Sequence, residues 1–271
     1  LKNLLVESID NNNGNCPSPA FFDEKEVYRN FSSPRGLALI INNRVFKEMV
    51  ERVGTEVDGR NLENLFSQLC YQLCVLKDLT AKEMLQAIQS FARRREHGLL
   101  DSCVVCVLTH GENDKLFGVD DKPLSVHEFV SQLNAINCPP LAQKPKIFIL
   151  QACRGGMHFS CLRLLVLYLL INGFCQFDAI VFRLPVEADF LIACATVPGY
   201  VSWRNNIRGS WFIQSICEVF AKFAKQLEIV DMLTLVNRRV AEEYESSRDS
   251  YKQIPECSTR LRKKFFFFPG L

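Results

Sequence analysis

Short apolar runs separated by helix-like patterns are the feature that most constrains the fold of this chain. Four of the runs lie between turn-forming residues, at 37–41, 103–108, 146–150 and 189–195. A strand that is apolar on both sides is buried on both faces, which is typical of parallel sheets. Segments with apolar residues at helical spacing lie between the runs. We therefore predict an α/β fold with a central, mostly parallel sheet and helices on both faces.

Two weaker signals bring the predicted sheet to six strands. They lie at 71–76 and at 265–268, where Pro269 and Gly270 end the second run. Helices are predicted after the turn-like string Asp58-Gly59-Arg60-Asn61, after the capping-box residues Thr80 and Ser125, and over 210–223 and 229–244.

The composition limits the class of protein. The chain has 271 residues and a formal charge of +2, which allows a large core but gives no basic surplus for nucleic acid. Many of its twelve cysteines lie inside apolar runs and lack the paired spacing of a zinc site. We predict a protein of a reducing compartment, the cytoplasm, with no metal and no other cofactor. The apolar run 164–177 falls short of the roughly 20 residues that span a membrane, so no membrane partner is predicted.

Chemically useful side chains follow the carboxyl ends of the predicted strands. His110 comes after the run at 103–108, and Cys153 comes after the run at 146–150. Arg52 and Arg204 lie in the segments that follow two other runs. Ligands bind outside the carboxyl ends of the strands in sheets of this kind, so we expect these side chains to share one site.

A cysteine and a histidine in one site are the minimum that a thiolate nucleophile with a proton carrier needs. The thiolate of Cys153 would attack a carbonyl, while His110 would carry the proton. The backbone N–H groups of Gly111 and Cys153 are suitable donors to the resulting oxyanion.

Arg52, Gln151 and Arg204 form a second predicted group. Two guanidiniums and an amide offer donors for one carboxylate, which arginine binds in a bidentate manner. Trp203 and Trp211 lie near Arg204 and are predicted to line a groove for peptide side chains; a core position in a helix is the alternative for Trp211.

Longer strings carry a family resemblance. They are YRNFSSPRGLALIINN (28–43), GTEVDGRNL (54–62), LTHGEND (108–114), GVDD (118–121), KPKIFILQACRGG (144–156), DFLIACATVPGYVSWRN (189–205) and RGSWFIQSICEVF (208–220). With these strings the chain resembles the caspase family, and its sequence is most similar to those of nematode cell-death caspases.

The resemblance implies peptide hydrolysis after aspartate in apoptotic or otherwise regulated proteolysis, with protein substrates. It implies Cys153 as nucleophile, His110 as its partner and Gly111 as oxyanion donor. Six residues would bind substrate: Arg52, Gln151, Arg204, Ser202, Trp203 and Trp211. A homodimer or heterodimer through the strand at 265–268 and activation by cleavage between two subunits are also implied.

The resemblance divides the chain into four parts, and one of them, 157–183, does not match the family pattern. An N-terminal arm or short propeptide (1–28) precedes a large-subunit region (29–156), and a small-subunit region (184–271) ends the chain. The segment 157–183 is mostly apolar, unlike a polar, cleavable linker, and translated non-coding sequence is one hypothesis for it.

The sequence leaves two questions open: where the chain is cleaved, and whether it is catalytically active. Asp10 and Asp178 are the candidate cleavage sites, and Asp178 is the only acidic residue of 157–183. A segment that displaces the active thiol would leave a catalytically impaired protein, one that dimerises with active caspases and regulates them.

Overall fold

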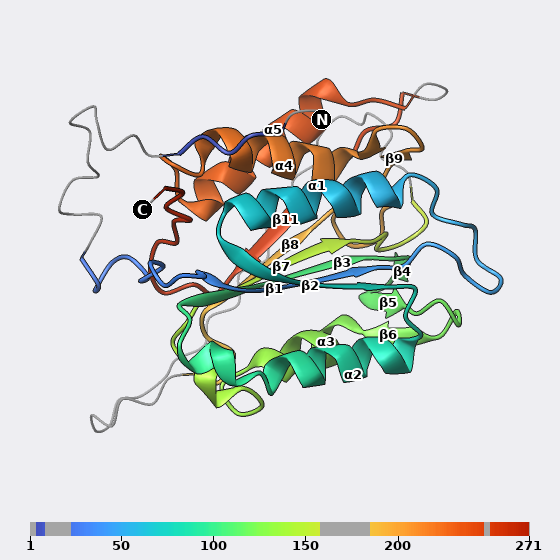
Figure 1. Ribbon diagram of the computed structural model, residues 1–271. Coiled ribbons are helices and arrows are strands. Elements are labelled where there is room, and N and C mark those ends of the chain that lie inside the picture. Colours follow the sequence, from blue (N-terminus) through green and yellow to red (C-terminus); the bar gives the residue numbers. More distant parts are fainter. Residues whose placement is uncertain (1–3, 9–22, 158–184, 247–249, 271) are drawn as a thin grey trace, which may run out of the picture.

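The computed structural model describes residues 4–8, 23–157, 185–246 and 250–270 (Figure 1). Its centre is a six-stranded sheet with the strand order β11-β8-β7-β3-β1-β2. The strands are β1 (Gly36–Asn42), β2 (Tyr71–Lys77), β3 (Ser102–Leu108), β7 (Lys146–Gln151), β8 (Phe190–Cys194) and β11 (Glu256–Thr259). Neighbouring strands are parallel except for β11, which runs antiparallel to β8. The predicted α/β class and the mostly parallel sheet are confirmed.

Helices cover both faces of the sheet (Figure 1). One face carries α1 (Thr55–Gln68), α4 (Trp211–Phe223) and α5 (Ile229–Glu243), and the other carries α2 (Ala81–Ala92) and α3 (Val126–Val130). Successive side chains of β1 alternate between two cores: Ala38 packs in the core under α1 and α4, and Leu39 packs in the core under α2. Every residue of β1, β3 and β7 is buried, which is why these strands are apolar except at their ends.

A small three-stranded sheet and a two-stranded hairpin extend the fold beyond the carboxyl ends of two central strands. After β3 come β4 (Gly111–Glu112), β5 (Lys115–Phe117) and β6 (Pro123–Ser125), and after β8 come β9 (Arg204–Asn205) and β10 (Gly209–Ser210). The short strands were not predicted, because runs of two or three residues carry no periodic signal. They give shape to the sheet edge where the predicted site lies.

The two predicted subunit regions share one sheet. The region 29–156 supplies β1, β2, β3 and β7, and the region 184–271 supplies β8 and β11. Residues 4–8 lie against the helices, since the Glu7 N–H donates to Ala221 O at 2.8 Å. Asp10, Asp178 and all of 157–183 except Met157 lie outside the described residues. No helix within the described ranges is long and apolar enough to cross a membrane.

The predicted closing strand at 265–268 is wrong. The edge strand is β11, and the four phenylalanines lie in an irregular segment in which none is more than 7% exposed. Phe265 and Phe267 join the core under α4, while Phe266 and Phe268 pack with Val27. Their carbonyls accept bonds from elsewhere in the chain, such as Ile229 N–H to Phe265 O at 2.9 Å. Alternate side chains therefore face two different cores here without a neighbouring strand among the described residues.

The predicted start of the first helix is also wrong. The Asp58-Gly59-Arg60-Asn61 string lies inside α1, which begins at Thr55. A Cβ at position 59 would lie 2.7 Å from the Asn42 side-chain nitrogen, so the glycine allows the helix to approach β1. Close packing has overridden a local turn signal.

The predicted capping box at the start of α2 is confirmed. Thr80 Oγ1 accepts the Glu83 N–H at 3.3 Å, and Glu83 Oε2 accepts the Thr80 N–H at 2.8 Å. We expect Thr80→Ala to lower the free energy of unfolding by about 1 kcal/mol, measured by urea denaturation. Thr234→Ala, inside α5, is the control and should change it by less than about 0.5 kcal/mol; equal effects of the two substitutions would contradict a capping role.

Candidate active site

His110 and Cys153 extend two neighbouring parallel strands at the same edge of the sheet. Leu108 of β3 is the register partner of Gln151 of β7. His110 lies two residues after Leu108, and Cys153 lies two residues after Gln151. Gly111 brings the two loops into contact, because a Cβ there would lie 2.5 Å from Cys153 O. Only glycine permits this approach.

A backbone carbonyl orients His110. Its Nε2 lies 2.8 Å from Val50 O, and a carbonyl can only accept, so Nε2 carries a proton. Nδ1 of the neutral ring is then the nitrogen that can accept a proton. Phe46 packs against the ring at a centroid distance of 4.6 Å. Sequence reasoning missed Val50, because every residue type supplies the same carbonyl group.

Burial lowers the pKa of His110 below its ordinary 6.5, and the charges of Arg52 and Arg204 lower it further, against the bond to Val50 O. We expect kcat/KM to fall as the pH drops through a value below 6.5, because the protonated ring cannot take the thiol proton. The kcat/KM values for an aspartyl and an asparaginyl peptide should fall together over this pH range. A midpoint above 6.5 would contradict this assignment.

Cys153 is half-buried and contacts the segment after β8. Its Sγ lies 3.4 Å from the Ser202 N–H, which donates to it, and 3.5 Å from Ser202 Oγ. Two other thiols lie inside the sheet, where burial raises the pKa of Cys103 to about 12 and also raises that of Cys106. The nine cysteines within the described ranges are all free, so these buried thiols are inert packing groups.

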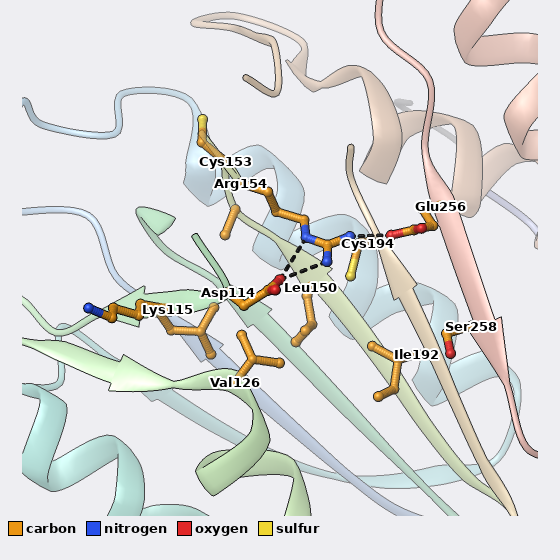
Figure 2. Close-up of a pocket in the computed structure, with 12 residues that line it drawn as sticks. Asp114, Lys115, Val126, Leu150, Cys153, Arg154, Ile192, Cys194, Glu256 and Ser258 are labelled. Atoms are coloured by element: carbon orange, nitrogen blue, oxygen red, sulfur yellow. Dashed lines mark hydrogen bonds and ion pairs between the residues drawn. The ribbon is translucent and has the colours of Figure 1, made fainter. Parts of the chain in front are cut away.

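Backbone bonds fix the loop that follows Cys153. Arg154 N–H donates to Tyr200 O at 2.9 Å, and Val201 N–H donates to Met157 O at 3.0 Å. The Arg154 guanidinium reaches between Asp114 and Glu256 (Figure 2), with a bond of 2.7 Å to Asp114. Arg154 therefore ties the candidate nucleophile's loop to β11 and to the turn before β5.

A cavity of about 220 Å³ lies beside this loop. Cys153 is on its wall, together with Arg154, Cys194 of β8 and Glu256 of β11 (Figure 2).

Arg52 and Arg204 lie close enough for their charges to interact. Burial, followed by the charge of Arg204, lowers the pKa of Arg52 to about 9, and burial also lowers the pKa of Arg204. Cys153 acts electrostatically on both arginines, so all three groups share one region.

The hydrogen bonds of the two guanidiniums go to uncharged oxygens. Arg52 donates to Asn43 O and Thr55 Oγ1, each at 2.9 Å, and Arg204 donates to Val53 O at 2.9 Å. Among the described residues, no carboxylate forms an ion pair with either arginine. The charges of Asp58 and Glu56 act on both arginines, but neither carboxylate is paired directly with either of these guanidiniums. The two guanidiniums can therefore bind an anionic ligand directly.

Gln151 is linked to Cys153 through Ser202. Its Nε2 donates to Ser202 Oγ at 3.0 Å, and its buried Oε1 has no hydrogen-bond partner among the described residues. Because a hydroxyl both donates and accepts, the amide can turn over, keep the bond to Ser202 and offer Nε2 to a ligand.

The two tryptophans form part of an aromatic stack. Trp203 and Trp211 have ring centroids 5.8 Å apart; Tyr251 stacks on Trp203 at 5.8 Å, and Tyr244 stacks on Trp211 at 5.5 Å. Trp211 is the first residue of α4 and is 8% exposed. It therefore has the position of a core residue that supports Trp203.

Known proteins resemble this chain over most of its length. The caspase domain family matches residues 35–266. Caspase-3 of Bos taurus is 41% identical over 90% of this chain and 88% of its own, and caspase-3 of Mesocricetus auratus is 36% identical over 99% and 95%. Cell death protein 3 of Caenorhabditis remanei is 42% identical over 92% of this chain, which spans 53% of that protein's length. The chain belongs to the caspase family of cysteine peptidases.

Proposed function

We propose that this chain is a cysteine endopeptidase that cleaves peptide bonds after aspartate, in the apoptotic or regulated proteolysis suggested by the names of its relatives. The observation that carries the proposal is the pair of arginines beside Cys153, Arg52 buried and Arg204 half-buried, whose printed hydrogen bonds go to uncharged oxygens.

The chemistry follows from the placement of the donors and acceptors. His110 Nδ1 takes the proton of Cys153, and the sulfur bonds to the substrate's carbonyl carbon. His110 then protonates the leaving amine as the C–N bond breaks. Water hydrolyses the resulting thioester and regenerates the thiol.

Gly111 is the proposed donor to the oxyanion. Phe117 N–H donates to His110 O at 2.9 Å, so that pair is hydrogen-bonded in the β4–β5 ladder. Bonded and non-bonded pairs alternate along an antiparallel ladder, and Gly111 pairs with Leu116 at the next position. The Gly111 N–H is therefore directed away from β5 and is available to the reacting carbonyl, together with the Cys153 N–H.

Aspartate specificity follows from the charges of Arg52 and Arg204. A substrate carboxylate would pair directly with Arg52 and Arg204 and accept from Gln151. An asparagine side chain brings no charge and would leave the two guanidiniums without a direct ion pair.

The deciding experiment pairs two peptides that differ only in aspartate or asparagine before the cut bond. We expect kcat/KM to be at least about 10³-fold higher for aspartate, because the site's buried donors reject the neutral analogue. An aspartyl electrophile should label Cys153, located by mass spectrometry. Cleavage of both peptides at similar rates would contradict aspartate specificity.

One observation favours a second function, regulation of an active caspase by dimerisation. The strand β11 pairs only with β8 among the described strands, so its outer edge is available to another chain. Formation of a heterodimer without labelling of Cys153 would support this function over proteolysis.

A further inference from the structure

A buried carboxylate joins α1 to the hairpin that carries Arg204. Asp58 is fully buried, and its Oδ1 accepts the Ser210 N–H at 2.8 Å while its Oδ2 accepts the Ser210 hydroxyl at 2.5 Å. The neighbouring Gly209 leaves room for the carboxylate, because a Cβ there would lie 2.2 Å from Asp58 Oδ1. The backbone N–H and the hydroxyl of Ser210 thus both donate to one side chain of another element.

The hydroxyl of Ser210 is free for this bond because it does not cap its own helix. Ser210 is the N-cap residue of α4, where a serine ordinarily accepts a backbone N–H of the first turn. No such side-chain bond forms here, and the hydroxyl donates to Asp58 instead. The local preference for helix capping has given way to a contact with α1.

The contact continues from Ser210 to Arg204. Ser210 of β10 is the register partner of Arg204 of β9. The Arg204 Nε donates to Val53 O, directly beside Arg52 in the loop before α1. A closed set of contacts therefore runs from Asp58 through Ser210 and Arg204 to the segment that carries Arg52.

We propose that Asp58 is the positioning residue of the aspartate pocket: through Ser210 it holds the β9–β10 hairpin so that Arg204 faces the same ligand as Arg52. Burial raises the pKa of Asp58 to about 6, and its bonds to Ser210 oppose the rise, so the group is charged at neutral pH. This inference rests on the proposed function, because the pocket is the one assigned to the substrate carboxylate.

The test compares Asp58→Ala with Asp58→Asn in peptide-cleavage assays. The alanine variant loses both bonds, and we expect its KM for the aspartyl peptide to rise roughly tenfold or more, with kcat changed about twofold at most. Asparagine can still accept from the Ser210 N–H and donate to its hydroxyl, so KM should stay within about 1.5-fold of the wild type. Glu63→Gln removes another carboxylate of α1 and should leave KM unchanged.

Several results would overturn the proposal. A wild-type KM in Asp58→Ala, or equal losses in the alanine and asparagine variants, would remove the positioning role. If Asp58→Ala does not fold, Ser210→Ala decides: a KM raised about threefold supports the proposal, and an unchanged KM defeats it. The rate at which iodoacetamide alkylates Cys153 should be the same in every variant, since the role concerns the pocket. A wild-type protein without aspartyl preference would defeat the proposed function itself.

Discussion

Cys153→Ala should lower kcat/KM for an aspartyl peptide by at least about 10⁴-fold, the loss typical of removing a covalent nucleophile. The remaining donors can still bind substrate, so KM should change far less than kcat. The variant should also resist labelling by an aspartyl electrophile, and a melting curve should show that it remains folded.

A second cysteine on the same cavity wall provides the matched control. Cys194 lines the cavity with Cys153, and burial raises its pKa to about 11, so at neutral pH it is an unreactive thiol (Figure 2). Cys194→Ala should retain activity within about threefold of the wild type, as for a substitution away from the reacting groups. Comparable losses in both variants would assign the effect to the shape of the cavity.

The strands and the edge where the site lies could be predicted because burial on both faces leaves a strong sequence signal. The run at 103–108 has no polar residue, and its carboxyl end fixes the position of His110. The edge strand β11 was missed because its four residues are half-buried or exposed, so Glu256 to Thr259 carry little apolar pattern. The phenylalanines at 265–268 carried a strong pattern, but they are buried by side chains and single backbone bonds instead of a neighbouring strand.

The parts of the site that the sequence did not reveal act through the backbone or through another residue. Val50 contributes a carbonyl, which leaves no trace in residue type. Asp58 was assigned to a turn, and only the packing of α1 against β10 places it beside Ser210. Residues that contact a substrate carry recognisable chemistry, whereas residues that position them depend on distances across the fold.

Arg52→Gln should separate stability from specificity. Arg52 is 1% exposed, and burial lowers its pKa to about 9, well below the 12.5 of a free guanidinium. A base whose pKa falls on folding destabilises the fold fully at every pH below the lowered value, and the penalty decreases only as the pH rises from about 9 towards 12.5. At neutral pH we therefore expect the glutamine variant to have an unchanged or higher free energy of unfolding, measured by urea denaturation.

The same substitution should weaken catalysis on aspartyl peptides. Losing one charged donor of the pocket should lower kcat/KM by roughly 10²–10³-fold for the aspartyl peptide, the cost of removing one partner of a buried ion pair. The asparaginyl peptide should change much less, because its neutral side chain does not depend on the charge of Arg52. Arg60→Gln, an exposed arginine of α1, is the control and should leave both peptides unaffected. Equal losses for both peptides would mean that Arg52 supports the active-site loops instead of recognising a carboxylate.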